Sequence, residues 1–302
     1  MTEKHLAVVI LAAGQGTRMK SKTPKVMHEI AGLPLIGHAL ATATAPALDA
    51  AHVIPVVRHE KELISEYIRA HFPTATIADQ DEIPGTGRAV ECALTALPAD
   101  FNGAVVVTSG DVPLLDVATI EALLETHLEN KNSATILTTY LDDPTGYGRV
   151  LRDTAGEFIE IVEQRDASAA QLEIDEVNAG VYVFDVVALR AALAKVGTHN
   201  AQGEKYLTDV AAVLIDEKQR VEAIAVEDSW LVAGINDRQQ LSEVAAELNY
   251  RICAAWQLAG VTIQDPSTTW IDVTVSIGPD ATLLPSTHLK GMTVIGEDAI
   301  VG

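Results

Sequence analysis

The C-terminal part of the chain repeats an apolar side chain at every sixth position. Glycine follows directly at positions 278, 296 and 302, and the repeated residues are Ile271, Ile277, Leu283, Leu289, Ile295 and Val301. This six-residue period is typical of a parallel β-helix. A six-residue face cannot bury itself alone and is stable only when it is stacked between neighbouring coils. The period therefore predicts the first coils of a β-helix over residues 261–302.

The repeat continues to the last residues, "AIVG", and no capping element follows it. Solenoids need a polar terminal unit to cover the last apolar face. We therefore expect the natural protein to continue, with this chain as a truncated form of it.

A helical pattern precedes the repeat. Apolar residues recur at three- and four-residue spacing from Leu241 to Trp256, within residues 238–259, and Gly260 is well placed to end a helix. The pattern predicts one long amphipathic helix inside a linker of residues 229–260.

Upstream, short β-rich runs alternate with helical stretches. The runs are "LAVVIL", "AHVIPVV", "ATIAD", "GAVVVTSGD" and "SATILTTY", and the helical stretches include "KELISEYIRA" and "VATIEALLETHLEN". This alternation indicates βα units around a mainly parallel sheet. Residues 147–184 break the rhythm with three runs that have no helix between them, "YGRVLRD", "EFIEIVEQ" and "NAGVYVFD", which predict an antiparallel insertion. The expected fold class is α/β, with a Rossmann-like domain over residues 1–228.

Charge and cysteine content exclude several kinds of partner. The formal charge of −21 disfavours nucleic acid and anionic membrane surfaces as partners. Only Cys92 and Cys253 are present, far apart and in no metal-binding spacing, so neither a disulfide framework nor a zinc site is expected. The apolar opening leads into a basic loop rather than a cleavage site and is too short to span a bilayer, so we expect a cytoplasmic protein.

The basic loop "LAAGQGTRMKSKTPK", residues 11–25, carries four basic side chains in this acidic chain. It is not a dinucleotide fingerprint, because Met19 stands where a third glycine is needed, and it is not a P-loop. Gly14 and Gly16 allow a ligand to approach the backbone, and Arg18 and Lys25 supply positive charge. On these residues alone, a phosphate site and a glycine turn with solvated lysines are equally good interpretations.

The extended segment "LAAGQGTRMKSKTPKVMHEIAG" resembles the signature of sugar-nucleotide pyrophosphorylases. Within them it is most similar to the bifunctional N-acetylglucosamine-1-phosphate uridyltransferases/glucosamine-1-phosphate acetyltransferases. Further similar segments follow in the family's order: "PGTGRAV", "SGDVPLL", "LDDPTGYGRV", "IVEQRDA", "EVNAGVY", "NAQGEKYLTD" and "VAGINDRQQL". The resemblance covers essentially the whole chain and favours actinobacterial members. It also implies a left-handed β-helix and a role in UDP-N-acetylglucosamine supply for peptidoglycan.

The resemblance implies roles for individual residues. Catalytic roles fall to Arg18 and Lys25, and Mg2+ binding to Asp111 and Asn236. The helix N-cap is a competing role for Asn236. Nucleotide binding is implied for Leu11, Ala12, Ala13, Gly14, Lys25, Gln80, Gly85 and Thr86. Sugar-phosphate binding is implied for Gly148, Glu163, Asn178 and Thr208, with Tyr206 beside Thr208.

The implied reaction joins UTP and N-acetylglucosamine-1-phosphate to give UDP-N-acetylglucosamine and pyrophosphate, by Mg2+-assisted in-line attack on the α-phosphorus. Acetyl transfer and a homotrimer are expected of the full-length protein and lost or weakened in this chain. Two alternatives stay open: the same chemistry on another sugar-1-phosphate, and a sugar-nucleotide-binding scaffold without turnover.

Overall fold

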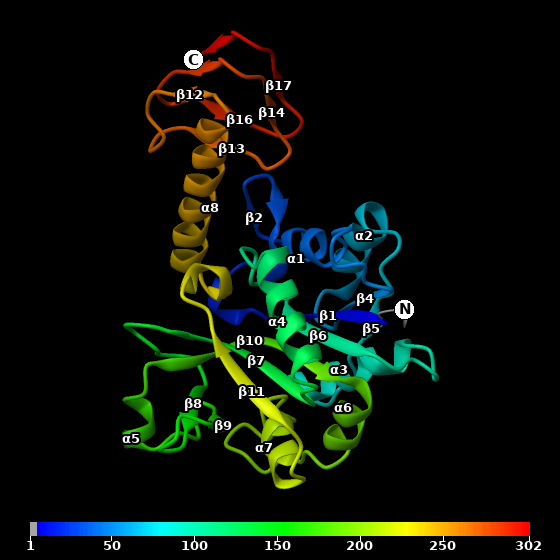
Figure 1. The fold of residues 1–302 in the computed structure, drawn as a ribbon. Coiled ribbons are helices and arrows are strands. Elements are labelled where there is room, and N and C mark those ends of the chain that lie inside the picture. The colour runs from blue at the N-terminus through cyan, green and yellow to red at the C-terminus, as the bar shows by residue number, and fades with distance from the viewer. Residues whose placement is uncertain (1–4) are drawn as a thin grey trace. The chain divides into compact units, whose positions relative to one another are not determined.

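The computed structural model describes residues 5–302, which form two compact units (Figure 1). The first contains the residues up to Gln15 together with Ala39–Ala233, and the second contains Gly16–His38 together with Gly234–Gly302. Because residues 16–38 group with the C-terminal residues, these units are not consecutive segments of sequence. The boundaries 1–228, 229–260 and 261–302, drawn along the chain, stay a prediction.

A mainly parallel sheet forms the centre of the first unit. Its strand order is β11-β7-β10-β6-β1-β4-β5, and within it β1 is parallel to both β4 and β6. The strand bounds are β1 Leu6–Ala12, β4 His52–Val57, β5 Ala78–Asp79, β6 Ala104–Ser109, β7 Ala134–Tyr140, β10 Glu176–Asp185 and β11 Val221–Ala225. The predicted α/β class is confirmed, although the run "ATIAD" contributes only the two residues of β5.

Helices cover the sheet because its strands are apolar on both faces. Ala7 and Val9 of β1 belong to one buried cluster, while Val8 and Ile10, which point to the opposite face, are also fully buried. α3 contacts β1 and β4, and α4 contacts β6 and β7. The helix bounds are α1 Leu35–Ala43, α2 Lys61–His71, α3 Thr86–Ala96, α4 Val117–Glu129, α5 Ala169–Leu172, α6 Val186–Leu193 and α7 Asp209–Asp216.

The predicted antiparallel insertion is present. β8 (Arg149–Arg152) and β9 (Phe158–Val162) form an antiparallel pair, and β8 also pairs with β10 through Arg149 and Val177. β10 runs antiparallel to β6 and β7, and its register with β7 shifts between Asn178 and Val181. The insertion therefore joins the main sheet through β10.

The second unit contains the β-helix coils and the helix before them. α8 spans Arg238–Leu258, as predicted. Pairs such as Trp270 with His288 and Ser276 with Val294 are parallel and 18 residues apart, so three six-residue repeats make one coil. The strands are β12 Thr262–Ile263, β13 Trp270–Ile271, β14 Ser276–Ile277, β15 Thr282–Leu283, β16 His288–Leu289, β17 Val294–Ile295 and β18 Ile300–Val301. The prediction of a β-helix start is confirmed.

The second unit also contains two 3-10 turns, a short hairpin and the N-cap of α8. The 3-10 turns Thr17–Met19 and Lys25–Met27 precede the hairpin of β2 (Glu29–Ile30) and β3 (Leu33–Pro34). Asp237, not Asn236, caps α8, because its carboxylate accepts hydrogen bonds from the backbone N–H groups of Gln239 and Gln240, both at 2.9 Å. The alternative N-cap role of Asn236 is therefore wrong.

Among the helices of residues 5–302, none has the length and apolar character that a membrane crossing requires.

Candidate functional site

Several predicted residues of the first unit lie at one edge of the sheet. β1, β4, β5 and β6 share a direction, so their carboxyl ends meet at the same edge. Backbone bonds join the loops there: Gly110 N–H donates to Leu11 O, and Gln80 N–H donates to Val57 O, both at 2.9 Å. Asp111 directly follows this Gly110. Because β10 is antiparallel to β6, Asn178 near the amino-terminal end of β10 lies at this edge too.

The first residues of the loop after β1 have unfilled space beside their backbone. Apart from Gly14 itself and its two chain neighbours, no atom of the described residues lies within 4 Å of a Cβ placed on Gly14. Leu11 and Ala13 are half-buried, Ala12 is buried at the end of the strand, and Gly14 is exposed. This stretch can therefore accept a ligand close to its backbone.

In the second unit, the loop continues with a tight turn. Gly16 has φ +63°, and a Cβ there would lie 2.5 Å from Cβ of Lys25. The glycine is needed for both reasons, since an L side chain rarely adopts this φ and would also collide with Lys25. The ammonium of Lys25 donates to Oδ1 of Asn236 at 3.1 Å, and Arg18 is exposed on its 3-10 turn. Lys25 and Asn236 are thus brought together.

The loop after β5 is organised by Gln80. Its Nε2 donates to the carbonyl oxygens of Ile83 (2.9 Å) and Gly85 (3.1 Å). An amide nitrogen has two N–H groups, so the carbonyl oxygen of this side chain is the atom left to meet a ligand. Oγ1 of Thr86 accepts a hydrogen bond from Leu207 N–H at 3.0 Å, which ties this loop to the segment before α7.

The four predicted sugar-phosphate residues form one packed cluster in the first unit. Thr208 Oγ1 donates to Glu163 Oε1 at 3.2 Å, and Asn178 N–H donates to Gly148 O at 2.9 Å. A Cβ on Gly148 would lie 2.9 Å from Ile161 Cγ2 and 3.6 Å from the Glu163 carboxyl. The cluster therefore brings together residues that are up to 60 positions apart in the chain.

Burial changes the acidity of this cluster. The pKa of Glu163 is raised above its usual value, mainly by desolvation, and the negative charges of Asp209 and Asp166 act in the same direction. The hydrogen bond from Thr208 opposes this rise. The side chain is thus held in a place where its carboxylate is poorly solvated and gains from further hydrogen-bond donors.

Tyr182 is a member of this cluster that the sequence patterns did not single out. Its hydroxyl accepts a hydrogen bond from Nδ2 of Asn178 at 2.7 Å, while Oδ1 of Asn178 accepts one from Gly180 N–H at 3.1 Å. Since a backbone N–H can only donate, these two bonds fix which way the Asn178 amide faces. The signal was its position in "NAGVY", four residues after the asparagine.

The candidate metal ligands belong to different units. Asp111 is half-buried two residues after the end of β6 in the first unit, and Asn236 is half-buried before α8 in the second. Both supply oxygen donors, which suit Mg2+. Oδ1 of Asn236 accepts a hydrogen bond from the ammonium of Lys25, so this oxygen already has a positively charged partner.

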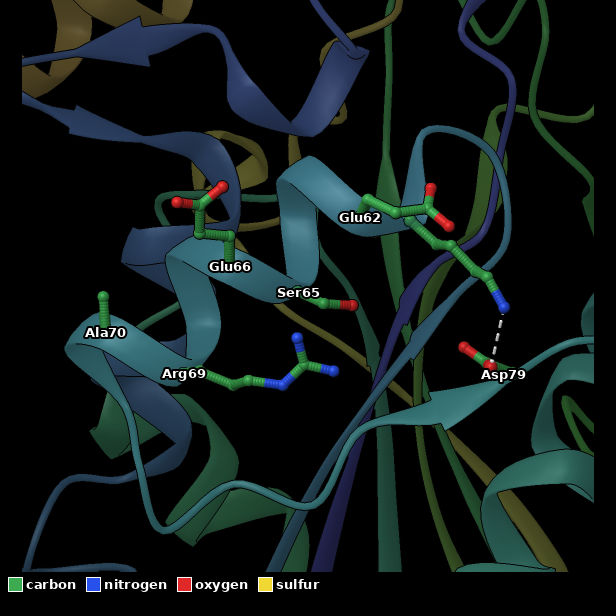
Figure 2. Close-up of a pocket in the computed structure, with 7 residues that line it drawn as sticks. Glu62, Ser65, Glu66, Arg69, Ala70 and Asp79 are labelled. Carbon is green, nitrogen blue, oxygen red and sulfur yellow. Dashed lines mark hydrogen bonds and ion pairs between the residues drawn. The ribbon is translucent and has the colours of Figure 1, made fainter.

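A surface pocket of about 600 Å³ lies between α2 and β5 (Figure 2). Lys61 Nζ and Asp79 Oδ2 form an ion pair of 3.0 Å in it, and Arg69 extends along its wall. The remaining lining residues are Glu62, Ser65, Glu66 and Ala70. None of the predicted site residues lines this pocket, although Asp79 directly precedes Gln80.

A mainly parallel sheet with helices against it and loops at its carboxyl edge is the architecture of the doubly wound α/β class, in which ligands bind at that edge. Residues 8–174, more than half of the chain, match the family described as MobA-like NTP transferase domain. The chain belongs to this family of nucleotidyltransferases.

Several curated proteins named "Bifunctional protein GlmU" are similar to the chain over nearly its whole length. The chain is 58% identical to the one from Clavibacter sepedonicus over 98% of its own length, and 55% identical to the one from Leifsonia xyli subsp. xyli over 99%. The relative from Mycolicibacterium smegmatis is 51% identical over 98%. The chain spans only 60 to 62% of the length of these relatives.

Solved structures share the fold at low sequence identity. A UDP-glucose pyrophosphorylase complexed with UDP-glucose has a TM-score of 0.65 at 15% identity, over 82% of this chain and 99% of the other. A 4-diphosphocytidyl-2C-methyl-D-erythritol synthase from Anaerococcus prevotii has a TM-score of 0.57 at 17% identity, over 81% and 98%. At these identities the likeness concerns the fold alone.

Proposed function

We propose that this chain transfers UMP from UTP to N-acetylglucosamine-1-phosphate, giving UDP-N-acetylglucosamine and pyrophosphate. The observation that carries the proposal is the packed cluster of Gly148, Glu163, Asn178 and Thr208 at the sheet edge that also holds the loop after β1. The GlmU relatives, at 49 to 58% identity, support it. The cytoplasmic location, acetyl transfer by a longer protein and its trimeric state stay predictions.

For the nucleotide, we assign the loop after β1 to the phosphates and the loop after β5 to the uracil. The open space beside Gly14 allows phosphate oxygens to reach the backbone N–H groups. The carbonyl oxygen of Gln80 is the acceptor for the N3–H of uracil, because both N–H groups of this side chain hold the loop. Cytosine has no N–H at this position, so the same geometry disfavours CTP.

For the sugar phosphate, Glu163 and Asn178 are the polar groups that meet the sugar. The poorly solvated carboxylate of Glu163 accepts hydrogen bonds from sugar hydroxyls, and Asn178 is held by Tyr182 and Gly180 in a single amide orientation. A site of this kind rejects sugars that lack its hydrogen-bonding group, since its buried partners are then left unpaired.

Catalysis on this proposal needs alignment and charge stabilisation, and no covalent nucleophile. The phosphate oxygen of the sugar attacks the α-phosphorus of UTP, while Arg18 and Lys25 offset negative charge on the departing pyrophosphate. Bound Mg2+, with Asp111 and Asn236 as its proposed ligands, supplies charge neutralisation of the phosphates.

The test is pyrophosphate release from UTP with Mg2+ and N-acetylglucosamine-1-phosphate, beside glucose-1-phosphate and a reaction without sugar. Release that requires the N-acetylated sugar supports the proposal. Faster release with glucose-1-phosphate would show a different sugar specificity, and UDP-N-acetylglucosamine binding without any release would show a scaffold. Asp111→Asn is expected to abolish release at limiting Mg2+, whereas Asp142→Asn, on an exposed loop, is the matched control.

A further inference from the structure

Two loops of the first unit share one set of backbone hydrogen bonds. Gly87 N–H donates to Lys205 O at 2.8 Å, and Lys205 N–H donates to Pro84 O at 3.1 Å. We call residues 84–87 the uracil loop and residues 205–208 the sugar loop, after their proposed ligands. The approach is so close that a Cβ on Gly85 would lie 2.3 Å from Lys205 O. The bond from Leu207 N–H to Thr86 Oγ1 adds a third connection.

The side chain of Lys205 adds a further link between the uracil loop and the sugar loop. Its Nζ donates to Oε1 of Glu91 at 2.5 Å, and only 13% of the side chain is exposed. Its stem crosses Gly87, since a Cβ there would lie 3.2 Å from Lys205 Cγ. Glu91 belongs to α3, the helix that begins in the uracil loop. The lysine therefore ties the sugar loop to the helix that carries the uracil loop.

The carboxylate that receives Lys205 is itself held in place. Oε2 of Glu91 accepts from Arg88 Nη1 at 3.0 Å, and Arg88 also forms an ion pair with Asp81 at 2.5 Å. Asp81 directly follows Gln80. Charged hydrogen bonds thus run from the residue beside the uracil reader, through α3, to the sugar loop. Within a partly buried network such bonds are stronger than isolated surface pairs.

At its other end the sugar loop reaches the sugar-phosphate cluster. Thr208, three residues after Lys205, donates to Glu163 at 3.2 Å. Lys205 is therefore connected to the uracil loop on one side and, through Thr208, to Glu163 on the other.

We infer that Lys205 is a positioning residue for both substrates, holding the uracil loop and the sugar loop in one geometry through Glu91. This inference rests on the proposed function. Lys205 acts through its neighbours and not on the reacting atoms, so its loss weakens ground-state and transition-state binding alike. Such a change raises KM and leaves kcat almost unaltered.

The test compares Lys205→Met with the wild-type chain in steady-state pyrophosphate release, and in calorimetric titration with UTP alone. We expect KM to rise at least fivefold for both UTP and N-acetylglucosamine-1-phosphate, with kcat within twofold. Lys205→Arg is expected to recover most of the loss because it keeps the charge opposite Glu91. Lys195→Met, which removes a surface ion pair with Glu217 in the same unit, is the matched control and is expected to change neither KM.

Glu91→Gln is a second, nearly isosteric variant, and it tests the inference even if Lys205→Met does not fold. If the two side chains act as a pair, Glu91→Gln raises both KM values, and the double variant is little worse than Lys205→Met alone. Unchanged KM values in both single variants, a rise for one substrate only, or strictly additive losses would overturn the inference while leaving the proposed function intact. A wild-type chain that binds no UTP would overturn both.

Discussion

Gly85→Ala places a methyl group where the uracil loop meets Lys205. Gly85 has φ +116° and ψ 153°, a region that is almost restricted to glycine and costs other residues about 1–3 kcal/mol. The new Cβ would also lie 2.3 Å from a backbone oxygen, which cannot rotate away as a side chain can. To relieve this collision the two loops must separate, which breaks the 2.8 Å hydrogen bond from Gly87 N–H to Lys205 O at a cost of about 1 kcal/mol. The sum is roughly 2–4 kcal/mol.

Thermal unfolding and UTP titration measure the two consequences. At roughly 2–4 °C per kcal/mol for a unit of this size, Tm is expected to fall by at least about 4 °C. UTP affinity is expected to fall about tenfold or more, which corresponds to roughly 1.4 kcal/mol. Gly156→Ala is the control, because Gly156 has φ +87° and no described atom other than its own and those of its chain neighbours lies within 4 Å of the added Cβ. Equal effects of the two variants on Tm and on UTP affinity would refute the argument from the collision.

Three further predictions concern charge. Arg18→Ala is expected to lower kcat more than it raises KM, because its charge acts on the departing pyrophosphate; an unchanged kcat contradicts this role. Because the pKa of Glu163 is raised, this side chain takes up a proton at a higher pH than an ordinary glutamate does. The affinity for UDP-N-acetylglucosamine, measured by calorimetry, should therefore decrease on acidification in the wild-type chain. In Glu163→Gln the affinity should not change with pH. Burial lowers the pKa of His127 to about 4. As the pH falls, His127 is protonated in the unfolded chain before it is protonated in the folded chain. The free energy of unfolding should therefore fall by up to about 3 kcal/mol between pH 6.5 and 4. Urea titrations measure this fall, and His127→Gln should lack the contribution of the histidine.

Patterns that are local in sequence predicted most of the fold. The six-residue period led directly to the coils, and the spacing of apolar residues placed α8 within one residue of its observed end. The β-rich run "LAVVIL" became β1, and its consecutive apolar residues fit the burial of this strand on both faces. These predictions succeed because the periodicity of a helix, strand or coil is set by its own backbone geometry.

The structure was needed to decide which of two adjacent residues has a given role. Asn236 and Asp237 are both good cap residues, and only the extended backbone of Asp237, with φ −142°, shows which side chain reaches the first N–H groups of α8. Likewise, the family resemblance implied nucleotide binding by Gln80, but nothing in the sequence indicated that both N–H groups of its side chain donate to backbone oxygens of the same loop.

The sequence by itself determined the element types, the order of the segments and the identity of the residues proposed to carry the chemistry. Only the tertiary structure decided which of them touch: Thr208 with Glu163, Asn178 with Tyr182, and Lys205 with Glu91. The last pair is separated by 114 positions, and no pattern along the chain encodes it. Such contacts depend on strand order and on the reversed direction of β10, which arise when the whole sheet packs and not from any local stretch of residues.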